Sequence, residues 1–221
     1  MSETTSGYML PKGRVLRYTF HERLIHWVAG STYVYLLLTG LAFWSPWLFW
    51  LATVLGGPTI SRELHPWIGI VWMVAVFLMY GMWSSQMHET ALDKQWWDSI
   101  GHYVRNEDEE VPTAGRFNGG QKLLFWGFFW CGILLLLSGI VLWFPQWIPW
   151  NLRFLRYISV IVHPAAALIT IGLFIIHVYM GTAMERGAFG SVIRGDVSAS
   201  WAKRYHGIWY EEITRGNPAR K

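Results

Sequence analysis

The chain has 221 residues, of which 53% are hydrophobic, 17% aromatic and only 14% charged. Soluble domains average about 25% charged residues, so the composition argues against an ordinary water-soluble enzyme and favours a membrane protein. The 16 Trp residues fit this class, because amphipathic aromatic side chains gather where hydrocarbon meets lipid headgroups. The net charge is +4, but the basic residues are spread over several segments and form no stripe typical of nucleic-acid binding.

The single cysteine, Cys131, excludes an internal disulfide framework, a zinc knuckle and a cysteine-held iron–sulfur cluster. Any redox cofactor must therefore have other ligands. The first residues, MSETTSGYMLPKGR, are polar and have no apolar stretch typical of a cleaved signal peptide. We therefore expect the first hydrophobic segment to stay in the mature protein.

Four stretches are long enough to cross a bilayer, which needs about 20 mainly apolar residues. They cover residues 24–44, 64–83, 123–144 and 158–184, and none contains Lys, Arg, Asp or Glu. The sequence therefore predicts an all-α fold: an integral membrane four-helix bundle. We expect residues 1–221 to form one membrane domain, with residues 185–221 as a tail.

The distribution of Lys and Arg predicts the orientation, because cytoplasmic loops retain these residues. The segment before the first span has four, the loop between spans two and three has four, and the tail has seven. The two other loops have only Arg62, Arg153 and Arg156. We therefore expect both termini and the tail to be cytoplasmic, in a multi-pass protein of the bacterial inner membrane.

Two polar regions lie outside the spans. Residues 84–121 are expected to form a solvated loop that includes the acidic run at residues 107–110. The tail segment WAKRYHGIWYEEI is typical of a short amphipathic helix at the inner membrane surface, where it could dock a partner.

Four of the eight histidines fall within or at the ends of the spans, where an ionisable side chain is a candidate for function. They are His26, His65, His163 and His177. The other four, including His206, lie in polar segments and are expected to be ordinary. His163 and His177 are 14 residues apart, so on one helix they would share a face to within roughly 40° and lie about 21 Å apart.

The expected depths of the four histidines in the membrane match in pairs. With the predicted orientation, His65 and His163 lie near the outer surface, and His26 and His177 near the inner one. Two stacked imidazole pairs in an apolar bundle are what two b-type haems require, each iron taking one ligand from either side. With both axial positions filled, the expected role is electron transfer rather than oxygen binding.

Other interpretations of these histidines stay open. A structural zinc site is the weaker one, because it usually needs four ligands and no thiolate or carboxylate is available in the spans. The histidines could also be hydrogen-bonded packing residues. Small residues such as Gly30, Gly40 and Gly172 would let a flat macrocycle approach, although they also serve helix contacts. Pro164 disfavours helical geometry at the residue before it, His163.

Several segments, in this order along the chain, resemble one known family. They are FHERLIHW, ELHPWIG, RFNGGQKLLFW, IVHPAAALITIGLFIIHVYM and WAKRYHGIWYEE. This set is similar to the cytochrome b subunit, or gamma chain, of membrane-bound respiratory formate dehydrogenases. The resemblance implies a four-helix membrane anchor with two b haems, one held by His65 and His163 and the other by His26 and His177.

The resemblance also implies partners. In such complexes a molybdenum or tungsten alpha subunit oxidises formate, and an iron–sulfur beta subunit passes electrons to the cytochrome. Formate oxidation would then lie outside this chain, whereas reduction of a quinone, menaquinone or ubiquinone, would take place on it.

The segment from Asn118 to Lys122 has two interpretations. As a helix start, Asn118 caps the third span and the glycines permit the turn. As a quinone pocket, which the resemblance favours, Asn118 and Gln121 bond a quinone carbonyl, Gly120 allows close approach, and His177 borders both quinone and haem.

Other functions remain open at this stage. The same haem scaffold could serve a nickel–iron hydrogenase or a thiosulfate reductase. A haem-free membrane anchor or a small proton-conducting protein belongs to a different class, although the absence of Asp and Glu from the spans argues against a carboxylate relay.

Overall fold

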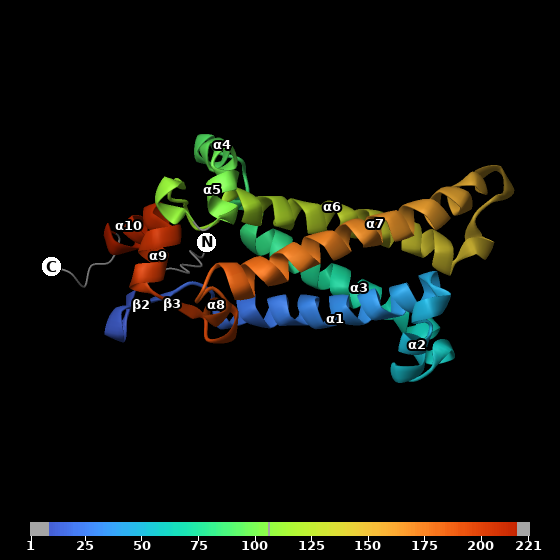
Figure 1. Ribbon diagram of the computed structural model, residues 1–221. Coiled ribbons are helices and arrows are strands. Elements are labelled where there is room, and N and C mark those ends of the chain that lie inside the picture. The colour runs from blue at the N-terminus through green and yellow to red at the C-terminus, as the bar shows by residue number, and fades with distance from the viewer. Residues whose placement is uncertain (1–8, 106, 216–221) are drawn as a thin grey trace. The chain divides into compact units, whose positions relative to one another are not determined.

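The computed structural model describes residues 9–105 and 107–215, in which four long helices dominate (Figure 1). They are α1 (Phe20–Trp44), α3 (Pro58–Trp83), α6 (Gly119–Trp143) and α7 (Phe154–Tyr179). A π-helical turn at Met180–Met184 continues α7. All four are long and apolar enough to cross a membrane, which confirms the prediction of four such helices.

Each long helix begins four to six residues before the predicted span. The reason is that the first turns carry polar capping residues, which do not register as hydrophobic. At α1, the Thr19 hydroxyl accepts from the Glu22 N–H at 3.4 Å, and the Thr19 N–H donates to the Glu22 carboxylate at 2.7 Å. At α3, Pro58 occupies the first position, where its missing N–H costs nothing.

Two prolines lie inside long helices, Pro66 in α3 and Pro164 in α7. The expectation that Pro164 would disturb the helix at His163 is wrong, because α7 is continuous from Phe154 to Tyr179. Proline removes one backbone hydrogen bond, but a membrane helix tolerates this loss where neighbouring helices support it. His163 and His177 therefore lie on one continuous helix.

The chain divides into two compact units, which are described separately. The bundle unit comprises residues 25–81 and 126–175. The terminal unit comprises the described residues within 1–24, 82–125 and 176–221.

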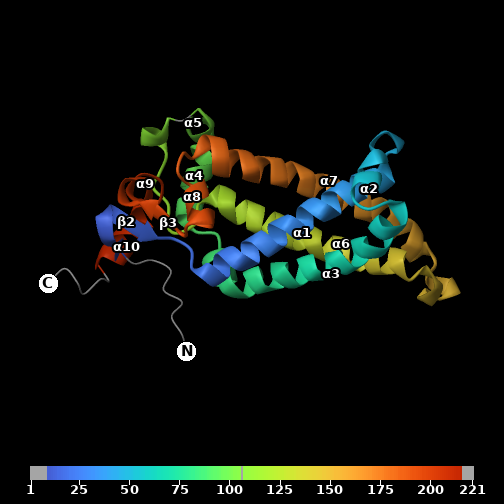
Figure 2. The same ribbon diagram turned by 90° about the horizontal axis from the view of Figure 1, so that it is seen from below.

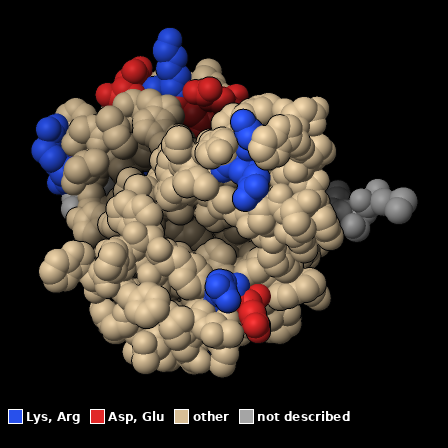
Figure 3. All heavy atoms as spheres, turned by 90° about the vertical axis from the view of Figure 1, so that its right-hand side faces the viewer, with Lys and Arg blue, Asp and Glu red and all other residues tan. Residues whose placement is uncertain are grey.

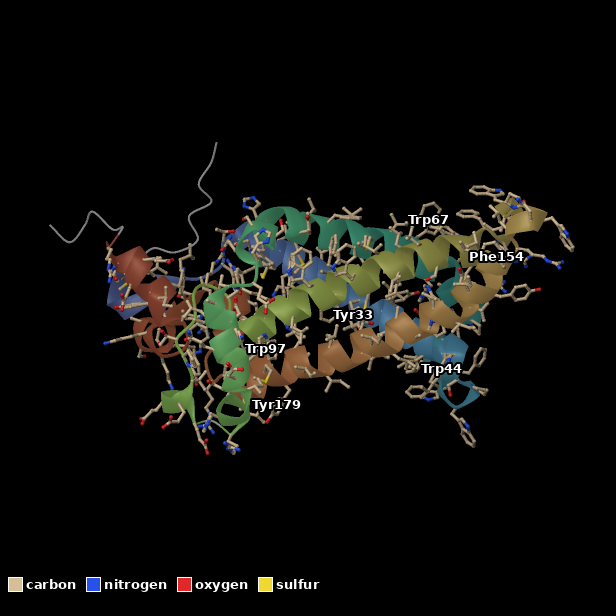
Figure 4. All side chains as sticks on the ribbon, turned by 90° about the horizontal axis from the view of Figure 1, so that it is seen from above. Tyr33, Trp44, Trp67, Trp97, Phe154 and Tyr179 are labelled. Carbon is tan, nitrogen blue, oxygen red and sulfur yellow. The ribbon has the colours of Figure 1, made fainter. Side chains whose placement is uncertain are left out.

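An aromatic cluster forms the core of the bundle unit. The Tyr33 ring lies among Trp72, Phe128 and Phe174, with ring centroids 5.0 to 5.8 Å apart. Its hydroxyl donates to Thr170 Oγ1 at 3.1 Å, so this polar atom is satisfied within the apolar core. Figure 4 shows Tyr33 midway along the helices of this unit.

The bundle unit is also rich in exposed aromatic side chains. Trp44, Trp67 and Phe154 lie toward the end that carries α2 (Trp50–Val54), as Figure 4 shows. Trp47, in the turn before α2, is 90% exposed. Exposed tryptophans at the ends of apolar helices are typical of a membrane–water interface.

The terminal unit contains a small antiparallel sheet in the order β1 (Met9–Leu10), β2 (Arg14–Leu16), β3 (Asp196–Ser198) (Figure 2). Val15 opposes Val197 in its register. The Arg14 guanidinium binds the Asp196 carboxylate through two contacts, at 2.6 and 2.7 Å. The sheet therefore joins the segment before α1 to the tail after α7.

Short helices complete the terminal unit. They are α4 (Ala91–Asp98), α5 (Ile100–Val104), α8 (Phe189–Ile193), α9 (Ala199–Tyr205) and α10 (Gly207–Arg215). The single amphipathic helix expected in the tail is therefore two helices, α9 and α10, which meet at His206. The region 84–121 is also less solvated than expected, because α4 and α5 bury Trp96 and Tyr103.

Candidate functional site

His65 and His163 lie together in the bundle unit. His65 is on α3 and His163 on α7, and their ring centroids are 6.4 Å apart with the planes inclined by 58°. Both side chains are half-buried. The structure thus brings together the two histidines that the sequence paired by depth.

Each of these imidazoles contacts a hydroxyl group. His65 Nδ1 is 2.7 Å from Thr39 Oγ1, and His163 Nδ1 is 2.9 Å from Ser138 Oγ. The two hydroxyls already donate their protons to carbonyl oxygens one turn back in their own helices, Thr39 to Tyr35 at 2.8 Å and Ser138 to Leu134 at 2.5 Å. The hydroxyl oxygens therefore accept from the imidazoles, which assigns the proton to Nδ1 in both rings.

This tautomer leaves the Nε2 lone pair of both rings for a metal. Metal-bound histidines usually donate their other ring N–H to an oxygen of the protein, which fixes the orientation of the ring. Thr39 and Ser138 provide that oxygen here. The sequence did not single them out, because a lone hydroxyl in an apolar helix is usually satisfied by its own backbone.

Two glycines leave room for the rings. A Cβ at Gly40 would lie 3.7 Å from His65 Cε1, and a Cβ at Gly139 would lie 3.2 Å from His163 Cε1. The second distance is tighter than an ordinary contact, so the His163 ring lies against α6 because residue 139 has no side chain. The two glycines therefore make room for the histidine rings themselves.

The spacing of the two rings fits a shared iron. Imidazole nitrogens bind first-row metals at about 2 Å, and the ring nitrogen lies about 1 Å from its centroid, so one bridging metal requires centroids about 6 Å apart. The observed separation is 6.4 Å. Figure 3 faces the end of the bundle unit that carries α2, and shows this face largely uncharged and hollowed between the helices. The residues present therefore fit a haem with two histidine ligands.

The other two predicted ligands are His26 on α1, in the bundle unit, and His177 near the end of α7, in the terminal unit. His26 is half-buried and His177 is exposed. A Cβ at Gly30 or Gly172 would meet no atom within 4 Å, so the chain leaves open space beside both of these small residues.

Asn118 and Gln121 form a reciprocal cap at the start of α6. Asn118 Oδ1 accepts from the Gln121 N–H at 2.9 Å, and Gln121 Oε1 accepts from the Asn118 N–H at 3.2 Å. This geometry confirms the helix-start interpretation of the segment. A Cβ at Gly120 would lie 2.9 Å from Trp96 Cη2, so the Trp96 indole occupies the space that a side chain at position 120 would need.

A cavity of about 310 Å³ in the terminal unit lies beside this cap. Its lining includes Asn118, Gly119 and the ion pair between Asp93 and Lys122, which are 2.6 Å apart. Burial alone would raise the pKa of Asp93, but the bonds from Lys122 and Thr90 outweigh it and lower that pKa. The quinone interpretation of Asn118, Gly120 and Gln121 stays a prediction.

The expectation that His206 is ordinary is wrong, since its side chain is completely buried. His206 Nδ1 donates to the Gly115 carbonyl at 2.7 Å, so Nε2 accepts from Arg17 Nη2 at 3.2 Å. Arg17 is itself 1% exposed and lies over the rings of Trp201 and Trp209 at 4.9 and 5.3 Å. Burial, with the nearby Arg17 charge, holds the pKa of His206 well below its ordinary value.

The terminal unit contains a second buried polar pair that the sequence did not predict. The Tyr103 hydroxyl donates to the Glu185 carboxylate, and the two side chains are 7% and 5% exposed. The Asn118 side chain lies beside the Tyr103 hydroxyl, where it lowers the pKa of Tyr103 against the larger effect of burial. No signal in one sequence links positions 103 and 185, which are 82 residues apart.

Comparisons with known proteins agree with the resemblance. A family model described as prokaryotic cytochrome b561 matches residues 17–195. The nitrate-inducible formate dehydrogenase cytochrome b556(Fdn) subunit of Escherichia coli K12 is 32% identical, over 91% of this chain and 92% of that protein. The cytochrome b556(fdo) subunit of the same strain is 32% identical, over 94% and 97%.

A third relative, the formate dehydrogenase cytochrome b556 subunit of Haemophilus influenzae, is 30% identical over 90% of this chain and 83% of its own length. The family match includes the whole of α1, α3, α6 and α7, together with all four candidate histidines. The family name implies a haem of the b type, which the His65–His163 pair fits. The chain belongs to the prokaryotic cytochrome b561 family, whose members are membrane cytochromes b.

Proposed function

We propose that this chain is the cytochrome b subunit of a formate dehydrogenase complex and passes electrons through two b haems to a quinone. The observation that carries the proposal is the pair of Nδ1-protonated imidazoles, His65 and His163, on facing helices of an apolar bundle. Three relatives that are formate dehydrogenase cytochrome b556 subunits support the choice of complex.

The residues at the first haem site have distinct roles. His65 and His163 would supply both axial ligands, while Thr39 and Ser138 hold the two rings in orientation. A haem b held by His65 and His163 would supply one-electron chemistry, so the proposed role of the site is electron transfer rather than oxygen binding.

For the second haem we propose His26 and His177 as ligands. The argument rests on the sequence: His177 follows His163 by 14 residues on one continuous helix, which puts both on one face at two depths. Open space beside Gly30 and Gly172 agrees with a macrocycle near these histidines.

We also propose that both termini are cytoplasmic, in the inner membrane of a bacterium. The excess of Lys and Arg in the N-terminal segment, the middle loop and the tail supports this orientation. Four spans require the segment before α1 and the tail after α7 to lie on the same side of the membrane. The pairing of β2 with β3, which joins these two segments, supports this arrangement.

The proposed route of electrons follows from this orientation. An iron–sulfur beta subunit, itself supplied by a molybdenum or tungsten alpha subunit, would deliver electrons at the outer pair, His65 and His163. The electrons would then pass to the inner pair, His26 and His177. Quinone would be reduced at the cytoplasmic side near Asn118 and His177, with protons from the cytoplasm.

The quinone site can be separated from the helix cap by two substitutions. If Asn118 and Gln121 bond quinone, Asn118→Leu and Gln121→Leu should leave both haems reducible but slow their reoxidation by a quinone analogue in stopped-flow spectroscopy. If the two residues serve only as the cap, the same variants lose about 1 kcal/mol of stability and reoxidise at the parent rate.

The direction of transfer is tested in proteoliposomes that contain the complete complex. In the proposed route, electrons cross the membrane inward and the protons for quinol are taken up on the inner side. Turnover with formate and quinone should therefore generate a membrane potential. Each electron works against about 2.3 kcal/mol per 100 mV, so an imposed potential should slow turnover. Turnover without a potential, or uptake of protons on the donor side, would contradict the proposed direction.

A further inference from the structure

A buried carboxylate and a buried phenol meet at the start of α6, and nothing described so far uses them. Glu185 follows the π-helical turn that ends α7, and Tyr103 lies on α5. The Tyr103 hydroxyl donates to Glu185 Oε1. A carboxylate that is 5% exposed costs free energy unless its environment compensates, so a buried Glu–Tyr pair is an expected place for chemistry.

On one side, Tyr103 lies next to residues of the proposed quinone site. The Asn118 side chain lies beside the Tyr103 hydroxyl and lowers the pKa of Tyr103, while its Oδ1 accepts from the Gln121 N–H. The Tyr103 ring also lies 4.9 Å from the Trp96 ring, whose far edge fills the space beside Gly120. Tyr103 is thus held by the same residues that form the Asn118 cap.

On the other side the pair approaches solvent. An open cavity of about 570 Å³ in the terminal unit is lined by Met184 and Arg186, the two neighbours of Glu185 in the chain. Tyr205, whose charge would oppose ionisation of Tyr103, lines the same cavity. Both chain neighbours of Glu185 therefore lie at a cavity open to solvent, which makes this cavity the proposed source of protons for the Glu185 carboxylate.

Tyr103 has the properties of a relay rather than of an anion. Burial, with the Glu185 carboxylate beside it, raises the pKa of Tyr103 far above its ordinary value. The hydroxyl therefore keeps its proton, and it can give that proton up only while it receives another. Glu185 is the group placed to supply it.

We propose that Glu185 and Tyr103 conduct a proton from the terminal-unit surface to the quinone oxygen held at Asn118. This inference rests on the proposed function, which supplies the electrons one at a time from reduced haem b. The Tyr103 O–H bond breaks as the quinone O–H bond forms, and the protonated Glu185 carboxyl restores the Tyr103 proton. The carboxylate is then reprotonated from water at the cavity, and the second proton of the quinol reaches the opposite oxygen from water.

The test uses the purified complex with its haems reduced by dithionite and then mixed with menadione in a stopped-flow spectrometer. A positioned proton donor contributes about 10²- to 10⁴-fold to rate, so Tyr103→Phe and Glu185→Gln should slow haem reoxidation at least tenfold. Haem content, the haem spectrum and menadione affinity should stay at the parent values. The remaining reoxidation should show a larger solvent deuterium isotope effect than the parent.

Two matched variants make the same chemical changes elsewhere in the terminal unit. Tyr179→Phe removes a hydroxyl that donates to Met184 Sδ at 4.0 Å, and Glu211→Gln breaks an exposed ion pair with Arg215. Both should reoxidise at the parent rate. In Glu185→Ala, acetate should restore the reoxidation rate in proportion to its concentration, whereas a purely structural Glu185 could not be replaced by acetate.

The outcomes separate the two proposals. If menadione does not reoxidise the haem of the parent complex, the proposed quinone function itself fails. If the parent reacts and Tyr103→Phe and Glu185→Gln match it in rate and isotope effect, the proton route is wrong. A slow Glu185→Ala variant that acetate does not restore also overturns the route, because Glu185 is then only structural.

Discussion

The two units handle buried polar groups in opposite ways. In the bundle unit, the described polar side chains with the least exposure carry hydroxyls, such as Thr39 and Ser138, which bond their own backbone and an imidazole. In the terminal unit the buried polar side chains include charged pairs, such as Arg116–Glu22 at 2.7 Å and Lys122–Asp93 at 2.6 Å. The histidines follow the same division, since His65 faces a hydroxyl and His206 faces a guanidinium.

This difference separates two uses of histidine. A hydroxyl can accept from Nδ1 and leave Nε2 open, which prepares His65 and His163 to bind a metal. At His206 both nitrogens are taken by protein groups, so the ring serves to hold Arg17 and the loop at Gly115. The comparison predicts that substitution of His65 or His163 changes cofactor content, whereas substitution of His206 changes stability.

The largest expected effect is the loss of one haem. His65→Ala should remove the outer haem and leave most of the inner one, and His26→Ala should do the reverse, because each iron needs two imidazoles. The haem-to-protein ratio should be near two in the parent and near one in each variant. Unchanged haem content in both variants would remove the basis for the ligand assignment.

Removal of the His206 ring should destabilise the terminal unit. His206→Ala leaves the Gly115 carbonyl without its donor and removes one of the two acceptors of the buried Arg17 Nη2, which also donates to the Arg116 carbonyl at 3.0 Å. A hydrogen bond to a charged group is worth about 1.5–3 kcal/mol. We expect a fall of that size in the free energy of unfolding, measured by thermal melting, with haem content unchanged. His102→Ala is the matched control: this histidine pairs with Glu107 on the surface, where such pairs contribute about 0–1 kcal/mol.

The hydroxyls behind the outer histidines should have a smaller effect on the haem than the histidines themselves. Loss of such a partner typically costs about 10- to 100-fold in metal affinity, so Ser138→Ala and Thr39→Val should keep the haem but release it faster to excess apomyoglobin. Thr32→Val on α1 removes a hydroxyl that bonds only its own helix, so its haem release should match the parent. Equal release from all three variants would show that Thr39 and Ser138 do not support the ligands.

The smallest effect is a dependence on pH. The pKa of folded His206 lies well below its ordinary value of about 6.5, so below pH 6.5 the unfolded chain binds the proton more readily. The free energy of unfolding should therefore fall on acidification, by up to about 1.4 kcal/mol per pH unit, and His206→Gln should lose this dependence. A parent and a variant with parallel pH curves between about pH 6.5 and 5 would show that another group is responsible.

The sequence predicts the bundle unit better than the terminal unit for a physical reason. Spans and the depths of His65 and His163 follow from hydrophobic length and helix rise, which are local properties. The buried contacts of Arg17, Glu185 and His206 join segments 82 to 189 residues apart, and no local pattern encodes them. Arg17 contributed to the predicted orientation as a cytoplasmic cation, yet it is buried under two tryptophans.

The segment around Asn118 has both a local feature, which the sequence predicts, and a long-range contact, which it does not. Its role as a helix cap is local, and the residue type of Asn118 before an apolar run predicted it correctly, whereas the part of Gln121 in the cap was not predicted. The contact of Gly120 with Trp96, 24 residues before it, is not local and was not predicted, while the role of Gly120 in a quinone site stays a prediction. A glycine in a sequence indicates that some group lies close to the backbone, but it does not identify that group.

The central claim, that four histidines act as two defined pairs, is tested most directly by the haem content of two double variants. His65→Ala combined with His163→Ala removes both ligands of one haem, so the ratio should stay near one, as in either single variant. His65→Ala combined with His26→Ala removes one ligand from each haem, so the ratio should fall to near zero. Equal haem content in the two double variants would contradict the pairing.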